Sequence, residues 1–596
     1  MAKNMLLILF LPAFVSFIKA QSADSYLLDY CSYLGGQHFE QARDIAVDQH
    51  GFVYLTGGTS SPNFPTTPGA YNTIYNNAGS GTVGSWGPMM VFVSKFSPEG
   101  QLVWSTLLGG PNYDRAYAIE VDKDGYVYVG GRAGDDFPTT SGVVQEQFIQ
   151  QGSINTLYGH QNGFIAKLSP DGSQLIWSSY YGSDSYGFFR DIDIDDEGYV
   201  YGILNAVKTE PIGVPDDAFD PDLNGNYDMV AVKFSPDATE VEWATFLGGT
   251  GNDDGGPSIQ AGPDKSVYVA GGTRSTDIPV TSNAVQAQYG GAGDMFVARV
   301  SPDGKALIYG TYFGGSGLEY SETHSLFVDH LGQAYVACGT GSNDAMTTPG
   351  TIKPQRTGTE NDCLFFKLST DGTQLLASTY FGGTGNDGPE GLYVDSLQNL
   401  YVCGSTASTD LPVTSNAFQA QNLGGTDGLL VKMNPSFSSA LYSTYFGGTK
   451  DDAFRAFNVT NGGVICASGQ TLSTNLPVTS NAFQAIHASP NNNNRPDSFL
   501  SLFDLEEISP VKDPSKKSLL VEVYPNPFSN LLFINTGAES ISQITLWDQL
   551  GRKHYSNQQG DWWITGLPTD ELPSGIYWLQ IMLEGEVLVM KKVIKP

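Results

Sequence analysis

The sequence predicts an all-β protein, built as a ring of repeated four-stranded sheets followed by a small β-sandwich. Three observations lead to this prediction. A phrase of the form aromatic-Gly-Gly recurs along the chain, and short alternating strands joined by tight turns follow each copy. The composition is rich in glycine (70 of 596 residues) and low in charged residues (15 %).

The first twenty residues have the pattern of a secretory signal peptide. Lys3 gives a positive start, Met5 to Ile18 form an apolar run of 14 residues, and Ala20 precedes a plausible cleavage point. This run is too short to span a bilayer comfortably, and no later segment is apolar enough to do so. We therefore expect residues 1–20 to be removed and the mature chain to be exported, with no transmembrane segment.

Residues 21–505 contain seven copies of one repeat, spaced 65 to 74 residues apart. The copies of the glycine phrase begin at Tyr33, Leu107, Tyr180, Phe246, Tyr312, Tyr380 and Tyr445. After each copy come a short strand, an Asp-to-Gly turn, a second strand, a long loop, a third strand, and a turn such as "SPDG" into a fourth strand. Four antiparallel strands per unit, repeated seven times, predict a seven-bladed β-propeller. A parallel β-helix, the main alternative, has a repeat of only about 20–30 residues.

The two ends of the repeat region complement each other. The seventh unit stops at its third strand (498–505), whereas the mature chain begins with an unattached strand of the fourth-strand pattern (25–36). We expect the N-terminal strand to complete blade seven, which closes the ring and removes exposed sheet edges.

Charge and cysteine content exclude some functions. A net charge of −32 disfavours binding to nucleic acid or to anionic membranes. The odd number of cysteines and the absence of a CxxC spacing favour buried free thiols over a metal site. These cysteines are Cys31, Cys338, Cys363, Cys403 and Cys466.

An acidic residue recurs four positions after the second glycine of the repeated phrase. It is present in six units and replaced by Gly187 in the third, the six being Glu40, Asp114, Asp253, Glu319, Asp387 and Asp452. Such a carboxylate can accept backbone N–H groups and brace the crossing between blades. Alternatively it can contribute an oxygen to a calcium site, although no single loop supplies enough ligands. The sequence therefore predicts no required cofactor and leaves calcium open.

A second position, on the innermost strand of each blade, varies in type. It is expected to line the mouth of the central channel and holds Arg43, Tyr117, Arg190, Pro257, His324, Glu390 and Arg455. Arginines beside a histidine and a tyrosine suit a site for carboxylate or sulfate groups, and we predict ligand binding by these residues, Pro257 excepted. The alternative is a solvated rim in which Arg455 and Glu390 only pair with each other. No HExxH, GxSxG or P-loop motif is present, so no catalytic residues are predicted.

The full repeat, with "STYFGG", "VYVxG", "LPVTSNAFQ" and "SPDG", resembles the bacterial SBBP repeat over residues 25–505. This resemblance implies an exported propeller and does not identify a ligand.

The chain changes character after Leu505. Residues 506–518 are charged and contain two prolines, as in a linker, and residues 519–596 show short alternating strands typical of a small Ig-like β-sandwich. The phrases "YPNPFSN", "DQLGR", "LPSGIYWLQI" and "KKVIKP" resemble the type A C-terminal sorting domain of the type IX secretion system of Bacteroidetes. The matching residues are Tyr524, Pro525, Asn526, Pro527, Gly551, Gly575, Tyr577, Lys591 and Lys592. The resemblance implies the type IX translocon as a partner and residence on the cell surface or in the medium. The alternative is an Ig-like adhesion module.

From the sequence we expect a monomeric, non-catalytic binding or adhesion module for extracellular polysaccharide or protein. Two alternatives stay open. One is a propeller lyase or glycosidase acting on acidic glycans, in which Tyr117 and His324 act as bases beside the arginines. The other is a passive surface or matrix component. Similarity of fold cannot choose among them.

Overall fold

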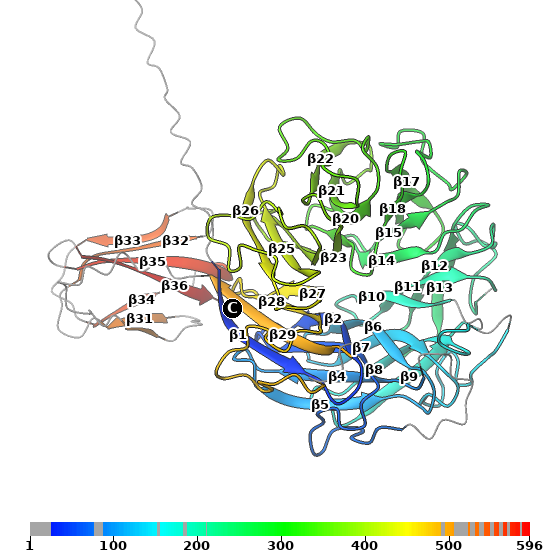
Figure 1. The fold of residues 1–596 in the computed structure, drawn as a ribbon, viewed down its shortest axis with the longest axis horizontal. Coiled ribbons are helices and arrows are strands. Elements are labelled where there is room, and N and C mark those ends of the chain that lie inside the picture. The colour runs from blue at the N-terminus through cyan, green and yellow to red at the C-terminus, as the bar shows by residue number, and fades with distance from the viewer. Residues whose placement is uncertain are drawn as a thin grey trace, which may run out of the picture.

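The computed structural model describes residues 26–76, 87–151, 155–182, 187–209, 211–489, 495–505, 522–524, 531–535, 541–548, 553–558, 564–568, 572–583 and 587–595. The predicted signal peptide (1–20) and linker (506–518) lie outside these residues. Within them the regular structure consists of strands, and no helix is present. Figure 1 shows one set of sheets arranged around a centre and a second, smaller group formed by the C-terminal strands.

Six of the sheets around the centre are built from strands that follow one another in the chain. The first holds β2 (Glu40–Val47), β3 (Val53–Thr59), β4 (Met90–Phe96) and β5 (Leu102–Leu108), and the second β6 (Arg115–Val121), β7 (Val127–Ala133), β8 (Asn162–Leu168) and β9 (Leu175–Tyr181). The third holds β10 (Phe188–Ile194), β11 (Val200–Val207), β12 (Asp228–Phe234) and β13 (Val241–Leu247), and the fourth β14 (Gly255–Ala261), β15 (Val267–Thr273), β16 (Asp294–Val300) and β17 (Leu307–Phe313). The fifth holds β18 (Glu319–Tyr320), β19 (Leu326–Val328), β20 (Ala334–Thr340), β21 (Asp362–Leu368) and β22 (Leu375–Phe381), and the sixth β23 (Asp387–Val394), β24 (Leu400–Thr406), β25 (Asp427–Met433) and β26 (Ala440–Phe446).

The seventh sheet joins the two ends of the repeat region. Its order is β27 (Asp452–Val459), β28 (Ile465–Thr471), β29 (Asp497–Leu505) and then the N-terminal strand β1 (Tyr26–Leu34). β1 and β29 run antiparallel from the pair Tyr26–Leu505 to the pair Leu34–Ser498. The unattached N-terminal strand thus supplies the fourth strand that the seventh repeat lacks.

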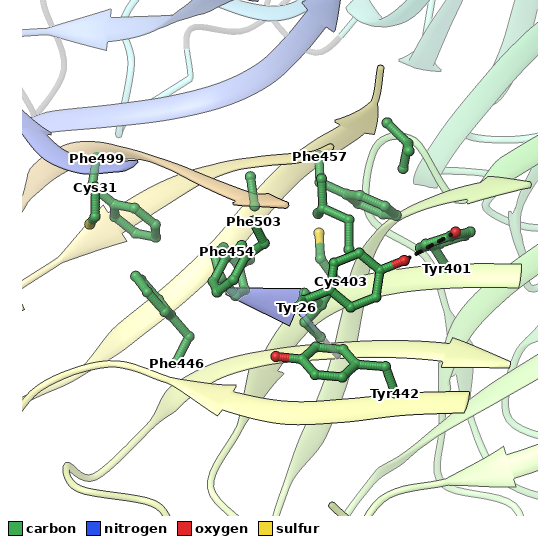
Figure 2. Packing of buried hydrophobic residues seen from close by; sticks show 14 of the residues in the cluster. Tyr26, Cys31, Tyr401, Cys403, Tyr442, Phe446, Phe454, Phe457, Phe499 and Phe503 are labelled. Atoms are coloured by element: carbon green, nitrogen blue, oxygen red, sulfur yellow. Dashed lines mark hydrogen bonds between the residues drawn. The ribbon is translucent and has the colours of Figure 1, made fainter. Parts of the chain in front are cut away.

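Side chains of β1 are part of the core of this region. Figure 2 shows Tyr26 and Cys31 among Phe446, Phe454 and Phe499, which come from the sixth and seventh sheets. The hydroxyls of Tyr26 and Tyr401 are 3.4 Å apart. Because these aromatic side chains are almost fully buried, pairing of β1 removes a large apolar area from water as well as a free strand edge.

The tyrosine that opens most copies of the glycine phrase fastens its blade's long loop. Tyr445 donates its hydroxyl to the Ser408 carbonyl (3.0 Å) and accepts the Leu411 N–H (2.8 Å). In the seventh sheet the N-terminal strand provides the same pair of bonds, since Tyr33 bonds to the Ser473 carbonyl (2.8 Å) and the Leu476 N–H (3.0 Å). β1 therefore reproduces the role of a fourth strand in its contacts as well as in its pairing.

Tryptophans of the outer strands join the first four sheets, each to the next. Trp104 Nε1 donates to the carbonyl of Pro170 in the following "SPDG" turn (3.0 Å). Its ring lies over Gly172, whose φ of +67° and lack of a side chain are both required, because a Cβ there would be 2.5 Å from the indole. Trp177 and Trp243 repeat the bond to Pro236 and Pro302. The "SPDG" phrases are hairpin turns, as their sequence predicted.

The C-terminal strands form two further sheets. One has the order β30 (Glu522–Tyr524), β31 (Leu531–Asn535), β34 (Ile564–Pro568), and the other β33 (Lys553–Gln558), β32 (Ile541–Asp548), β35 (Gly575–Leu583), β36 (Val587–Lys595). Of the predicted sorting motif, Tyr577 is buried and its hydroxyl donates to the Pro573 carbonyl (2.6 Å). Pro525, Asn526, Pro527 and Gly551 lie outside the described residues.

All five cysteines are buried free thiols, as predicted. Burial raises the pKa of each, so they are unreactive packing residues and not nucleophiles.

Candidate functional site: the central channel

The variable position of the repeat coincides with a β-bulge in the innermost strand. Six of the seven innermost strands shift register there, leaving a residue without a partner in the second strand. The residues at these shifts are Arg43, Tyr117, Arg190, Pro257 with Gly256, Glu390 and Arg455. A bulge re-aims its side chain, and the type of residue at this position varies from sheet to sheet.

The fifth sheet departs from this pattern. Its innermost strand is broken into β18 and β19, and the span from Glu319 to Val328 is two residues longer than the matching span from Asp387 to Val394 in the sixth sheet. We call the intervening residues 321–325 the insertion. It places Glu322 beside the arginines and His324 deeper in the channel.

Four guanidinium groups surround the ring of Tyr117. The guanidinium carbons of Arg115, Arg190, Arg43 and Arg132 lie 4.6, 5.0, 5.1 and 5.3 Å from the ring centroid. Arg115 also donates to the Tyr117 hydroxyl. Burial alone would raise the pKa of this fully buried tyrosine, but the four positive charges outweigh it and lower the pKa to about 7.

Two carboxylates face these arginines. Glu322 Oε2 lies 2.9 Å from Arg190 and 3.4 Å from Arg43, and Glu390 pairs with Arg455. Burial opposes ionisation of Glu322, yet Arg190, Arg43 and Arg455 hold its pKa near 2. The Arg455–Glu390 ion pair of the sequence alternative is present, although both side chains are mostly buried and do not form a solvated rim. Arg43 and Arg190 have a counter-ion, Glu322, that the repeat alignment missed.

Positive charge exceeds negative charge in this cluster. Against Glu322 and Glu390 stand five arginines, namely Arg43, Arg115, Arg132, Arg190 and Arg455. Among the described residues no carboxylate lies within ion-pair distance of Arg115 or Arg132. Arg132 is 4 % exposed and is held by aromatic rings, with its guanidinium carbon 3.6 Å from the centroid of Phe188 and 4.2 Å from that of Tyr158. We name these five arginines with Tyr117 the arginine cluster.

His324 lies between two carboxylates and not at the mouth with the arginines. Its Nε2 is 3.4 Å from Asp44 and its Nδ1 is 3.3 Å from Asp191, and Nε2 also bonds to the Tyr117 carbonyl (3.0 Å). Burial would lower the pKa of His324, but the two carboxylates and the carbonyl raise it to about 9. His324 therefore contacts residues of the first, second and third sheets, and its part in ligand binding stays a prediction.

The far end of the channel is acidic. Beyond His324 lies a hollow of about 160 Å³, lined on one side by acidic residues of the first three sheets, including Asp44, Glu120 and Asp193, and on the other by apolar side chains of the last three. Several of these carboxylates accept backbone N–H groups of the next sheet, as Asp44 does from Ile119 (2.7 Å) and Asp193 from Ala261 (2.7 Å). They therefore link neighbouring innermost strands.

The recurrent acids brace the crossings between sheets. Asp387 accepts the Gly383 N–H (2.7 Å) and the Ser408 hydroxyl (2.7 Å), and Glu40, Asp114, Asp253, Glu319 and Asp452 each accept the equivalent glycine N–H. All six are buried. The part of the chain that the structure describes contains no group of three or more His, Cys, Asp or Glu side chains arranged to hold a metal. The contacts agree with the bracing hypothesis, and calcium binding stays an untested prediction.

Known proteins share parts of this organisation. Residues 103–138 and 378–412 match the family described as beta-propeller repeat, SBBP. Residues 522–595 match the family described as secretion system C-terminal sorting domain. The chain thus carries SBBP propeller repeats and a type IX sorting domain, as the sequence resemblance indicated, and this domain indicates export to the cell surface or secretion. It also implies interaction with the secretion machinery. No described helix is long and apolar enough to cross a membrane.

A curated relative is the regulatory protein FlaEY of Caulobacter vibrioides, 26 % identical over 356 residues. The alignment covers 56 % of this chain and only 34 % of that protein. Among solved structures, the quinohemoprotein alcohol dehydrogenase from Comamonas testosteroni aligns with a TM-score of 0.37 and 10 % identity, covering 85 % of this chain and 80 % of the other. A europium-containing methanol dehydrogenase aligns with a TM-score of 0.36 and 10 % identity, covering 80 % and 93 %. TM-scores this low do not support an inference about function.

Proposed function

We propose that this protein is an exported seven-bladed β-propeller that binds an anionic extracellular polymer at the arginine cluster, without catalysing a reaction. In this proposal residues 21–505 form the propeller and residues 519–596 form an Ig-like sorting domain that delivers it through the type IX system. The ligand contributes carboxylate or sulfate groups, and the chain acts as a monomer.

The observation that carries the proposal is the excess of arginine over carboxylate within the arginine cluster. Burying a guanidinium without a counter-ion costs several kcal/mol, and among the described residues no carboxylate lies within ion-pair distance of two of the five, Arg115 and Arg132. We infer that a protein with a net charge of −32 does not gather this positive charge for stability alone. Buried nitrogens that lack a hydrogen-bond partner include Nε of Arg43, Arg115, Arg132 and Arg190 and Nη1 of Arg132. An anionic group from solvent would neutralise this charge and satisfy part of these donors.

A hollow next to the cluster offers room for the neutral part of a ligand. It has a volume of about 380 Å³ and is lined by Phe39, Asp451, Arg455 and Gln470, among others. Gln470 accepts from Gln41 (2.8 Å), and Gln41 accepts from Arg115 (2.9 Å), so polar contacts run from the hollow into the cluster. A ring of sugar size with an acidic substituent suits this combination of mixed polar and apolar lining, one phenyl ring and adjacent arginine.

The enzyme alternative has one supporting observation, the low pKa of Tyr117, which suits a general base. Tyr117, however, is 0 % exposed, and its hydroxyl already accepts a hydrogen bond from Arg115. A substrate carbon would not reach the hydroxyl, which is why we propose binding and not elimination.

The proposal is tested with the triple variant Arg43→Gln, Arg190→Gln, Arg455→Gln. The control removes the same charge from exposed positions, as Lys123→Gln, Arg274→Gln, Lys305→Gln. Wild type and control are expected to gain thermal stability with at least one acidic polysaccharide from a panel that includes neutral analogues. A ligand at about 100 times its Kd adds about 2.7 kcal/mol, which a melting curve resolves. Equal gains in melting temperature for wild type and triple variant would refute the site. Accumulation of unsaturated sugars would instead support the alternative that the protein is a lyase.

A further inference from the structure

We propose that Glu322 occupies a carboxylate subsite formed by Arg43 and Arg190, and that the carboxylate of a uronic-acid residue exchanges with it when the polymer binds. This inference rests on the function proposed above and names the ligand group and the residue that competes with it.

Glu322 stands between the arginines and solvent. Its side chain is 35 % exposed, whereas those of Arg43 and Arg190 are 6 % and 13 % exposed. The same Oε2 atom reaches both guanidiniums. A group arriving from solvent therefore meets Glu322 before it meets either arginine, and it can bind them only by replacing this oxygen.

The insertion that carries Glu322 is fixed on both sides of it. Before it, the Ser321 hydroxyl donates to the carbonyls of Gly255 (3.2 Å) and Gly256 (3.0 Å). After it, His324 holds a φ of +62° and contacts Asp44 and Asp191, and the Ser325 N–H donates to Ser258 (2.8 Å). Exchange then needs only a rotation of the Glu322 side chain, with no opening of the backbone.

The neighbouring fourth sheet is shaped to receive the insertion. Gly256 has a φ of +29°, and a Cβ at this position would lie 2.2 Å from the Ser321 carbonyl oxygen and 3.0 Å from the Glu322 Cα. The next residue of this bulge is Pro257, at the position where the other bulged sheets have Arg, Tyr or Glu. The fourth sheet thus has no long polar side chain at its bulge where the fifth supplies Glu322, which indicates a built position for Glu322.

The geometry favours a carboxylate as the exchanging group. Two guanidiniums converge on one carboxylate oxygen, and this occupant has a single negative charge and a planar head group. A uronate carboxylate reproduces this head group, while its sugar ring can extend toward the hollow beside Arg455. Sulfate and phosphate esters have a tetrahedral head group that the resident does not imitate.

The test uses isothermal calorimetry at fixed ionic strength, with the purified full-length mature protein and trigalacturonate as the probe. If Glu322 fills the subsite about nine-tenths of the time, its removal lowers the apparent Kd about tenfold. We expect this gain in Glu322→Gln, and no change in Glu360→Gln, which removes an equal charge from an exposed loop. Glu322→Asp keeps the charge but shortens the reach, so we expect an intermediate gain, and it serves if the glutamine variant does not fold.

The outcomes separate the two proposals. Binding by wild type with equal or weaker binding by both Glu322 variants overturns the exchange and leaves the proposed function intact. No binding of any anion by wild type or variants overturns both. An equal tenfold gain for free sulfate would overturn the carboxylate assignment, and a gain for neutral trigalactose would show that Glu322 acts only by steric exclusion, which also overturns it.

Discussion

The Nδ1 atom of His324 lies 3.3 Å from Oδ1 of Asp191, although the two residues belong to sheets that are not neighbours in the ring. This contact, with its counterpart to Asp44, ties the first, third and fifth sheets together through one side chain inside the channel.

The charge of His324 should stabilise the protein over a defined range of pH. Because its pKa is raised from 6.5 to about 9, the stabilisation is fully present below pH 6.5 and is lost as the pH rises through about 9. We expect His324→Asn, which tolerates the left-handed backbone, to lower the free energy of unfolding by about 2 kcal/mol below pH 6.5 and by much less above pH 9. Urea unfolding at both ends of this range measures it, and a loss independent of pH would contradict the ion pairs.

Tyr117 should titrate near neutral pH. Its phenolate is expected to appear in the ultraviolet difference spectrum with a midpoint near pH 7. Since the folded pKa is depressed, the associated stability is present above pH 10, the ordinary tyrosine value, and is lost as the pH falls through about 7. Tyr117→Phe should abolish this transition. Tyr113→Phe, at a tyrosine whose pKa burial raises to about 12, should leave it in place.

The bracing acids can be tested at one crossing. In Asp387 a single carboxylate oxygen, Oδ2, accepts both the Gly383 N–H and the Ser408 hydroxyl. Asp387→Asn replaces this charged acceptor with a neutral amide in a buried site, and we expect a loss of about 1–3 kcal/mol. Asp410→Asn, at an exposed residue of the same crossing, should cost less. EDTA should leave the melting temperature of wild type unchanged. A rise with Ca²⁺ that Asp387→Asn removes would instead identify these acids as metal ligands.

The N-terminal strand should contribute as much to the seventh sheet as a regular fourth strand does to its own. Tyr33→Phe and Tyr445→Phe each remove a buried hydroxyl that bonds to a loop carbonyl and a loop N–H. We expect similar losses of about 1–3 kcal/mol for the two variants, measured by urea unfolding. If Tyr33→Phe left the free energy of unfolding unchanged while Tyr445→Phe lowered it, β1 would contribute less to its sheet than a regular fourth strand does.

Repetition made much of the fold predictable from the sequence. The spacing of the glycine phrase defined the sheets, and the missing fourth strand at one end with the spare strand at the other predicted the pairing of β1 with β29. Alignment on the innermost strand also identified the bulged residues, because a position that is unpaired in the sheet is free to vary in type.

The missed residues of the site depart from the repeat. Glu322 has no equivalent in the other units, since two extra residues in the fifth sheet shift it out of the alignment. Arg132 belongs to a second strand and reaches the cluster only because its long side chain crosses to Phe188 of the next sheet. The two extra residues of the fifth repeat could have indicated an additional site residue such as Glu322. Nothing in the sequence indicated that the Arg132 side chain would contact the arginine cluster.

The pairing of Tyr26 with Leu505 has a kinetic consequence. This contact joins the first strand of the repeat region to the last, so these strands are farther apart in sequence than any other pair in the described sheets. β1 therefore stays unpaired until β29 has been synthesised. Until then the N-terminal segment, which is rich in aromatic side chains, is an unpaired strand that can associate with other chains. We therefore infer that the pairing of β1 with β29 is the last step of folding and not the first. Chains that end before residue 497 should then leave the ring of sheets open and should aggregate.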